Sequence, residues 1–491
     1  MQPATVRFLV KSKIILFVTF GSVTYGYSAS IIATTLGQPS FLSYFELDTR
    51  PDAANITGAM NGLFQAGGLF GTLSCIWTAD FFGRRMALCI NAVITVIGGA
   101  LQAGSVSNSM FIVMRFVTGW GIGALVTLVP LYQSEISPPK IRGLLVGMHG
   151  VLICVGYTSA SWVGVAFYFV NASGAQWRIP LAIQCIFPLV LAGGVMFLPE
   201  SPRWLIDHDR VEEAFKAFHA THAESSTDKS SEIEFEKLRQ QIRMEENEPK
   251  AFKDLWLRPS LRKRCIVGFL TLFAGQGSAT LVINNYGPSL YASLGYSTVM
   301  QLILQGAWIS VCPFGNLFNS LVVDRTGRTR LLAAGLAGCV IALIGECVTV
   351  SIFQKTGDKK IAAAAVFFLF LHIGFFSTTT DATSYIYAAE IFPTPLRAKG
   401  LAISVSGLFS ATIAFLMAAP VAFEQIGWKY YILFIVITTI MVVVILLYFP
   451  ETKQRSLEDI GVLFGDPPHI PHVEEDEKGG VVHVEAKSAD V

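Results

Sequence analysis

The chain has 491 residues, of which 52% are hydrophobic and 14% are charged, and its formal net charge is +1. Soluble domains carry roughly a quarter charged residues, so this chain lacks the polar surface of a water-soluble globule and is expected in a lipid bilayer. The nearly balanced charge gives no indication of nucleic-acid binding, which favours strongly basic surfaces.

Twelve apolar spans follow one another along the chain, each of roughly 20 residues, the length that crosses ~30 Å of hydrocarbon. The first begins at Ile14 and is long enough to be a membrane helix rather than a cleaved signal peptide. The predicted spans are 14–36, 57–79, 86–106, 109–132, 143–169, 179–198, 264–291, 297–323, 330–353, 361–389, 397–420 and 428–449. The sequence therefore predicts an all-α membrane protein with two six-helix units, at 14–198 and 263–449.

Polar segments flank and separate these two units. We expect a cytoplasmic N-terminus at 1–13 and a linker at 199–262, in which 211–218 and 232–246 have the pattern of short amphipathic helices. The tail at 450–491 is polar and carries an acidic run at 474–477, a composition that predicts a largely disordered segment.

The distribution of basic residues sets the expected orientation, because short cytoplasmic loops are enriched in lysine and arginine. With twelve spans, one side of the membrane receives Arg84, Arg85, Lys140, Arg142, Arg325, Arg328, Arg330, Arg397 and Lys399. Both termini and the linker are therefore expected in the cytoplasm, as in a multi-pass protein of the plasma membrane. Two Asn-X-Ser/Thr sequences, at Asn55 and Asn171, fall in outer loops and are candidate glycosylation sites.

Three charged motifs occur twice, once in each half. The pairs are Asp80–Arg85 with Asp324–Arg330, Glu135–Gly143 with Glu390–Gly400, and Pro199–Arg203 with Pro450–Lys453. Their offsets are similar, at 324 − 80 = 244, 390 − 135 = 255 and 450 − 199 = 251 residues. One long unit has been used twice, and a substrate path between duplicated membrane halves is the architecture of a secondary transporter.

These motifs, together with Arg115–Gly123 on the fourth span, resemble the sugar-porter family of the major facilitator superfamily, and most of all its fungal hexose and sugar transporters. The resemblance covers about 14–460. It implies two pseudo-symmetric six-helix bundles, a substrate site near the middle of the membrane, and alternating access by rocking of the halves.

The resemblance also implies that the repeated loop charges pair between helix ends when the cytoplasmic side is closed. A network of such pairs could bias a two-state equilibrium by a few kcal/mol. The expected cytoplasmic gate consists of Asp80, Arg84, Arg85, Glu135 and Arg142 in the first half, and Asp324, Arg325, Arg328, Glu390 and Arg397 in the second. The alternative is that these charges only set topology and are otherwise solvated.

Arg115 is a candidate for ion coupling, since an arginine within a membrane span is costly and needs a partner or water. Proton-coupled relatives carry an acid on the first helix in a Gly-Tyr-Asp sequence, whereas this chain has Gly26-Tyr27-Ser28. The missing acid favours facilitated diffusion. Arg115 could instead reach the outer headgroups or face an anionic substrate.

Sugar sites use neutral amide and hydroxyl groups beside aromatic faces. The expected substrate-binding residues are Gln276, Asn284, Asn285, Tyr286, Asn316, Asn319, Tyr385 and Tyr387, although interhelical hydrogen bonds use the same residue types. Relative to the family, Gly150 replaces a glutamine, Leu281 replaces an asparagine and Tyr385 replaces a tryptophan, so the pocket departs from that of ordinary glucose carriers. Gly287-Pro288 is the expected break in the seventh span.

Asp381 is the second coupling candidate. It precedes Glu390 by nine residues, or ~13 Å along a helix, which puts a carboxylate near the bilayer midplane. It could take up protons, bind a polar substrate, or sit protonated among neighbouring threonines. Uniport and proton symport therefore both stay open.

The eight cysteines are scattered through the apolar spans and form neither a disulfide framework nor a metal site by spacing. Without a nucleotide loop or a nucleophile–base pair, no enzyme and no cofactor are predicted. We predict a transporter for a sugar or polyol-like solute, with the lipid bilayer as a partner and, in the case of symport, protons as well. The alternatives are a non-transporting nutrient sensor on the same fold and an exporter of a specialised metabolite.

Overall fold

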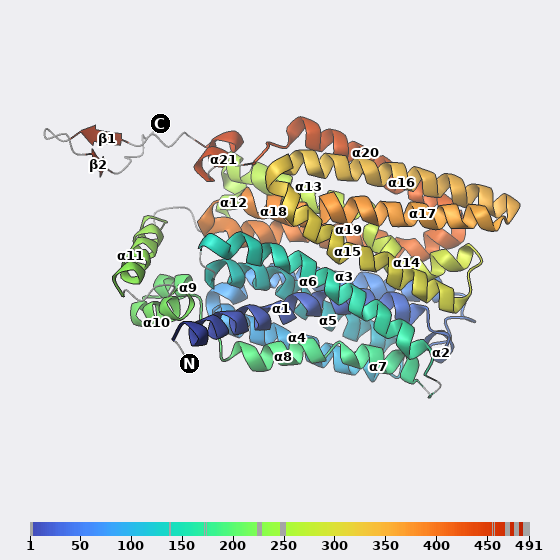
Figure 1. Cartoon of the computed structure of the whole chain (residues 1–491). Helices are drawn as coiled ribbons and strands as arrows, with labels where there is room; N and C mark the ends of the chain where they lie inside the picture. The colour runs from blue at the N-terminus through green and yellow to red at the C-terminus, as the bar shows by residue number, and fades with distance from the viewer. Residues whose placement is uncertain are drawn as a thin grey trace.

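The computed structural model describes residues 3–136, 139–170, 172, 174–222, 228–245, 252–453, 455, 457–466, 472–475 and 481–484 (Figure 1). The first half consists of α1 (Pro3–Leu36), α3 (Ala53–Phe82), α4 (Arg84–Ala103), α5 (Asn108–Ile136), α6 (Pro139–Tyr168), and α7 (Ala175–Ile183) continued by α8 (Ile186–Val195). A short helix, α2 (Pro39–Tyr44), lies between α1 and α3.

The second half repeats this arrangement. Its helices are α13 (Pro259–Gly277) with α14 (Thr280–Ser293), α15 (Thr298–Thr326), α16 (Arg328–Thr356), α17 (Lys359–Phe375) with the π-helix η1 (Phe376–Thr380) and α18 (Asp381–Glu390), α19 (Arg397–Ile426) and α20 (Tyr430–Tyr448). Short 3₁₀ turns, η2 (Thr394–Leu396) and η3 (Gly427–Lys429), precede α19 and α20. Figure 1 shows the blue-to-green first half beside the yellow-to-red second half, with their helices running in the same general direction.

Within the described residues, nine helical segments are long and apolar enough to cross a membrane. One of them, Arg397–Tyr448, holds both α19 and α20, and the long helices α1 and α3 lie outside the nine. Counting these together gives the twelve membrane helices of the major facilitator fold, as the sequence predicts.

The seventh span breaks at Ser278–Ala279 rather than at the expected Gly287-Pro288. Ala279 has φ +70°, a left-handed conformation, whereas Pro288 lies inside the continuous helix α14. The carbonyl groups freed by the break keep partners: Thr438 Oγ1 donates to Gly277 O at 3.0 Å, and His372 Nε2 lies 2.7 Å from Ser278 O. Such irregular backbone inside a membrane is tolerated where side chains satisfy it or where it lines a cavity.

The tenth span is also interrupted, by the π-helix η1. Here Thr378 Oγ1 donates to Gly374 O at 2.7 Å, and Thr379 Oγ1 donates to Phe375 O at 2.6 Å. Threonine hydroxyls that bond back to the preceding turn compete with the helix ladder and bend it. The distorted turn ends at Asp381, and π-helical turns are frequent at functional sites.

Glycines allow the helices of the first half to approach closely. A Cβ added at Gly26 of α1 would overlap the main-chain carbonyl of Ile153 on α6, and one at Gly123 of α5 would overlap that of Gly68 on α3. Small residues at such crossings take the place of the hydrophobic driving force that is absent in lipid.

The linker forms α9 (Pro202–Asp207), α10 (Val211–His222), α11 (Asp228–Glu245) and α12 (Asp254–Leu257), and in Figure 1 α9–α11 lie beyond the ends of the membrane helices. A small apolar core that includes Leu205, Phe218 and Phe235 holds α9, α10 and α11 together. The amphipathic pattern of the linker therefore serves packing between its own helices.

Parts of the tail form regular structure. Helix α21 (Leu457–Phe464) packs Ile460 and Phe464 into an apolar cluster of the second half, and Asp466 forms an ion pair with Arg264 of α13. Strand β1 (His472–Glu475) then pairs antiparallel with β2 (Val481–Val484). A largely disordered tail stays a prediction, since other parts of 450–491 lie outside the described residues.

Candidate functional site

A cavity with both apolar and polar lining residues lies between the two halves, near the broken helices. From the first half it is lined by Tyr25 of α1 and by Gly150 and Tyr157 of α6. From the second half its polar and aromatic lining comes from Gln276, Thr280, Asn284, Trp308, Asn316, Asp381 and Tyr385. Four of the eight expected substrate-binding residues, Gln276, Asn284, Asn316 and Tyr385, are thus brought together, along with Asp381.

Asp381 is the acidic group of this cavity, at the first position of α18. Asn316 Nδ2 donates to its Oδ2 at 2.8 Å, and the Cys154 thiol from α6 lies 3.8 Å from the same oxygen. Tyr25, Tyr157 and Tyr385 are close enough to interact electrostatically with its carboxyl group. Among the described lining residues there is no lysine, arginine or histidine, so no protein cation neutralises a carboxylate here.

Amide groups in the cavity wall have unused hydrogen-bonding capacity. Gln305 Nε2 donates to Asn284 O at 2.9 Å and to its Oδ1 at 3.2 Å, and Ser30 Oγ of α1 donates to the same Oδ1 at 3.4 Å. In the described structure, Asn284 Nδ2 and Gln276 Oε1 are buried without a hydrogen-bond partner. A buried unpaired amide is costly, so a donor and an acceptor in this wall are available for the hydroxyl groups of a solute.

Four expected substrate-binding residues lie outside the cavity lining, and their role in substrate binding stays a prediction. Asn285 Nδ2 donates to Leu281 O within its own helix, and Asn319 Oδ1 accepts from Thr383 Oγ1 at 2.7 Å. Tyr286 joins the halves, since its hydroxyl donates to Leu416 O at 2.9 Å and accepts from Asn61 Nδ2 at 2.8 Å. Asn319 and Tyr286 therefore use their polar atoms between helices, the alternative that membrane packing favours.

Tyr387 lies at the end of the second half where α20 leads into the tail. Its hydroxyl donates to Pro450 O at 2.9 Å and its ring stacks on Phe449, 5.9 Å away. Tyr132 does the same in the first half, where its hydroxyl donates to Pro199 O at 2.6 Å. Tyr132 and Tyr387 lie three residues before Glu135 and Glu390, respectively. This repeat in the sequence indicates that the two tyrosines occupy equivalent structural positions in the two halves.

The sequence analysis did not predict several of the lining residues, among them Tyr25, Tyr157 and Trp308. Tyr157 follows Gly150 by seven residues and so lies on the same face of α6, and Tyr25 adjoins the Gly26-Tyr27-Ser28 sequence. Tyr25 and Tyr157 could therefore have been predicted from the sequence as lining residues, if α1 and α6 are taken as walls of the substrate path.

Arg115 is fully buried inside the first half, with 1% of its surface exposed, so it does not reach the outer headgroups. Its Nε donates to Met60 O at 3.2 Å, its Nη1 donates to Ser28 O at 3.4 Å, and its guanidinium lies 3.9 Å from the centre of the Phe64 ring. The arginine therefore satisfies main-chain carbonyls at Ser28, where proton-coupled relatives have an acid, and it is absent from the cavity lining.

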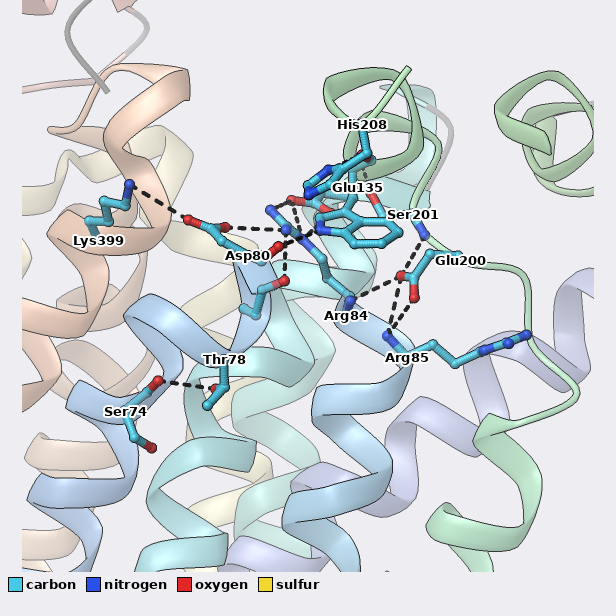
Figure 2. A network of polar contacts seen from close by, with 12 residues as sticks. Ser74, Thr78, Asp80, Arg84, Arg85, Glu135, Glu200, Ser201, His208 and Lys399 are labelled. Carbon is cyan, nitrogen blue, oxygen red and sulfur yellow. Dashed lines mark hydrogen bonds and ion pairs between the residues drawn. The ribbon is translucent and has the colours of Figure 1, made fainter. Parts of the chain in front are cut away.

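The charges at the end of the first half that leads into the linker form one network, drawn in Figure 2. Arg84 Nε and Nη2 donate to the Glu135 carboxylate at 2.9 and 3.0 Å, and Arg84 Nη1 donates to Asp80 Oδ1 at 3.3 Å. Glu200 accepts hydrogen bonds from the main-chain N–H groups of Arg84 and Arg85 at 3.0 and 3.2 Å. The ends of α3, α4 and α5 and the start of the linker are thereby tied together.

The second half repeats this network residue for residue. Arg328 Nε and Nη2 donate to Glu390 at 3.0 and 2.8 Å, and Nη2 also donates to Asp324 at 2.7 Å. Glu451 takes the place of Glu200 and accepts from the N–H groups of Arg328 and Thr329 at 2.9 and 3.1 Å. Gly83 and Gly327, with φ +85° and +103°, bring the main chain close to these two glutamates.

The two glutamates that cap α4 and α16 differ in their electrostatics. Burial raises the pKa of Glu200, and the hydrogen bonds that it accepts only partly offset this. Burial also acts to raise the pKa of Glu451, but hydrogen bonds from Thr329 and from the N–H groups of Arg328 and Lys453 outweigh it and hold this pKa below its ordinary value. Glu451 is therefore the better stabilised carboxylate.

Each network lies inside its own half, and an ion pair connects the first network with the second half. Lys399 Nζ of α19 lies 3.6 Å from Asp80 Oδ2 of α3 (Figure 2). Arg85 donates to Leu198 O at 3.2 Å, and Arg325 contributes its carbonyl to Lys453 Nζ. The side chain of Arg142 and the residue Asn171 lie outside the described part of the chain, Arg397 makes contacts of its own, and Asn55 is exposed at the start of α3.

A duplicated twelve-helix bundle around a central polar cavity, with matching charge networks at one end, defines a secondary transporter. The family model described as "Sugar (and other) transporter" matches residues 14–464, and the chain belongs to this family. It is 34% identical over 446 residues to the MFS-type transporter criB of Aspergillus cristatus, covering 90% of each chain. It is 28% identical to the high-affinity glucose transporter of Kluyveromyces lactis, covering 92% of this chain and 86% of that one.

The fold is similar to that of the proton:xylose symporter XylE of E. coli, with a TM-score of 0.77 and 20% identity, covering 93% of this chain and 100% of that chain. The protein is thus a multi-pass membrane transporter of a sugar or sugar-like solute, and not an enzyme. The relatives named as transporters do not favour the nutrient-sensor alternative.

Proposed function

We propose that this transporter carries a neutral, polyhydroxylated solute together with a proton, and that Asp381 holds the proton. The single observation that carries the proposal is the position of Asp381, a carboxyl group in the wall of the cavity between the halves with no cationic side chain among the described lining residues. An uncompensated carboxylate inside a membrane is expensive, so protonation during the transport cycle is the simplest neutralisation.

The surrounding groups support a neutral solute. Asn284 Nδ2 and Gln276 Oε1 offer a donor and an acceptor, and Tyr25, Tyr157 and Tyr385 provide aromatic faces from both halves. Sugar hydroxyls would complete the hydrogen bonds that the amides lack. The proton would stay close to the solute, because Asn316 bonds Asp381 and lines the same cavity.

The contacts of Arg115 also support a coupling role for Asp381 in place of the first-helix acid of proton-coupled relatives. That arginine is occupied by the carbonyl groups of Met60 and Ser28 and has no acidic partner among the contacts of the described residues. We therefore propose that Arg115 holds α1 and α3 in place, and that coupling has moved to α18 in the second half.

The test is uptake of labelled sugars, polyols and sugar acids in yeast lacking its own hexose carriers, at acidic and neutral pH, with and without a protonophore. Wild-type uptake should be higher at acidic pH and should be abolished by the protonophore. Asp381→Asn should lose this accumulation while it still exchanges solute down a gradient. Uptake by the wild type that ignores both pH and protonophore would show a uniporter and would overturn the coupling proposal.

Glu346→Gln is the matched control for Asp381→Asn. Glu346 is a second buried carboxyl group within the membrane, on α16, and it is absent from the cavity lining. Its replacement should leave the pH dependence of uptake unchanged, so that any general effect of removing a buried acid is measured separately.

We further propose a plasma-membrane location with both termini in the cytoplasm, on the same side as the charge networks. In that orientation Asn55, exposed at the start of α3, lies on the outer side and is the glycosylation candidate in the described chain. Treatment with an endoglycosidase should shift the mobility of the wild type but not that of Asn55→Gln. The absence of a shift in the wild type would refute glycosylation at Asn55. The proposed topology would then be tested by protease protection of tagged termini.

A further inference from the structure

Two cysteines that are 158 residues apart in sequence, Cys154 and Cys312, meet beside Asp381 in the cavity wall. One ligand atom from each, the two Sγ atoms and a carboxylate oxygen, lie within 4.8 Å of one another. Cys154 belongs to α6 of the first half, whereas Cys312 of α15 and Asp381 of α18 belong to the second. This cluster is separate from the charge networks at the cytoplasmic end.

The spacing of the three atoms suits a tetrahedral metal ion. With Zn–S bonds of about 2.3 Å and Zn–O bonds of about 2.1 Å, ligand atoms lie ~3.8 Å apart for a sulfur pair and ~3.6 Å for sulfur and oxygen. The separation of Cys154 Sγ and Asp381 Oδ2 is 3.8 Å. Small side-chain rotations would therefore bring all three atoms to bonding distance of one cation.

A fourth donor lies in the same cluster. Asn316 is fully buried, and its Nδ2 lies 3.1 Å from Cys154 Sγ and 2.8 Å from Asp381 Oδ2. Its Oδ1 is buried without a hydrogen-bond partner in the described structure. A half-turn of the amide would exchange the two atoms and direct the oxygen, an acceptable ligand for zinc, at the centre of the cluster.

Charge and access are also suitable. Cys312, Asn316 and Asp381 line the cavity, so an ion that enters with the solute reaches them, and the described lining has no basic side chain to repel it. Binding would release the two thiol protons, and the divalent cation would offset two of the three negative charges of the thiolates and the carboxylate. Thiolate ligands select a thiophilic d¹⁰ ion over magnesium or calcium.

We infer that Cys154, Cys312 and Asp381 form a binding site for a thiophilic divalent cation such as Zn²⁺. Because its ligands come from both halves, the bound cation clamps α6 to α15 and α18 and prevents the halves from rocking. Zn²⁺ is then an inhibitor that acts from within the transport path, and it competes with the proton for Asp381.

Binding is tested on the purified full-length protein, independently of transport. Cd²⁺ should bind with a stoichiometry of one and produce the ultraviolet thiolate-to-cadmium charge-transfer band, and Zn²⁺ should displace it. Cys154→Ser and Cys312→Ser should each lower the affinity at least about tenfold. Cys89→Ser is the matched control, since Cys89 lies on α4, donates to Ala192 O and is absent from the cavity, and this variant should bind as the wild type does.

The absence of a charge-transfer band, or an affinity unchanged in both cysteine variants, would overturn the inference and leave two thiols that only pack. If a serine variant fails to fold, the site is tested in the wild type by maleimide labelling of its cysteines. Zn²⁺ should slow the labelling of Cys154 and Cys312 but not that of Cys89. Equal labelling with and without Zn²⁺ would contradict the site.

The transport experiment depends on the proposed function, so its result is interpreted separately from that of the binding experiment. Micromolar Zn²⁺ should inhibit solute uptake, a chelator should reverse the inhibition, and Cys154→Ser should resist it. Cation binding without inhibition would keep the site but refute the clamp. Loss of proton coupling alone would leave the cation site untouched.

Discussion

The ion pair between Lys399 and Asp80 gives the most direct prediction about the gate that we propose at the cytoplasmic end. It joins α19 of the second half to α3 of the first, and a separation of the two halves at this end must break it. Lys399→Gln removes the charge while it keeps most of the side chain. We expect this variant to favour conformations in which the cytoplasmic side is open.

The expected change in free energy is small because the ion pair is exposed to solvent. The side chains of Lys399 and Asp80 are 20% and 50% exposed, and the nitrogen and oxygen are 3.6 Å apart. Exposed pairs of this kind contribute about 0.2–1 kcal/mol, which corresponds to about a 1.4- to 5-fold change in the ratio of the two conformations. At 1 M salt the Debye length falls to about 3 Å, so most of the effect should disappear.

Double electron–electron resonance between spin labels on the cytoplasmic ends of α3 and α19 measures this ratio in reconstituted protein. Arg210→Gln is the matched control, since it breaks an exposed ion pair with Glu213 that lies wholly within the linker. The reasoning would be refuted by an equal shift in the control, by no shift at low salt, or by a shift well above tenfold that salt does not reduce.

Three further predictions concern stability, each measured as thermal unfolding of the detergent-solubilised protein. Glu135→Gln removes the buried carboxylate that Arg84 binds and leaves this arginine only the half-exposed Asp80 as an ionic partner, so it should cost about 3–5 kcal/mol. Glu390→Gln, in a pair whose carboxylate is 29% exposed, should cost about 1–2 kcal/mol, and equal losses would contradict the burial argument. Gly123→Ala should cost about 1–3 kcal/mol through overlap with the neighbouring helix, whereas Gly193→Ala, with open space around its Cβ position, should be neutral. The folded-state pKa of Glu451 lies below its ordinary value of 4.5, so the ionised carboxylate stabilises the fold above that pH, and this contribution is lost as the pH falls. Glu451→Gln should therefore lower the free energy of unfolding at neutral pH by about 1 kcal/mol, and the difference from the wild type should shrink in acid. A difference that stays constant with pH would refute the assignment.

The sequence determined the features that depend on composition and on repetition along the chain. Apolar spans of membrane length predicted the helices, and the repeated charged motifs predicted that Arg84 and Glu135 belong together, as do Arg328 and Glu390. Each of these is a local signal: hydropathy is a sum over neighbouring residues, and a motif that occurs twice marks equivalent places in two copies of one fold.

The tertiary structure decided which face of each helix meets the cavity. Tyr385 and Tyr387 are two residues apart and so point about 200° away from each other on a helix; packing sends the first to the cavity and the second to Pro450. The position of the helix break at Ser278–Ala279, which turns Asn284 to the cavity and Asn285 away, depends on partners from distant helices for the freed carbonyls.

The cluster around Asp381 shows the same limit most clearly. Its importance as an intramembrane acid could be predicted from the chain, but its neighbours Cys154 and Cys312 could not, because nothing in a separation of 158 residues indicates contact. Residues on different halves become neighbours only when the bundles pack together, and a one-dimensional pattern carries no information on that packing.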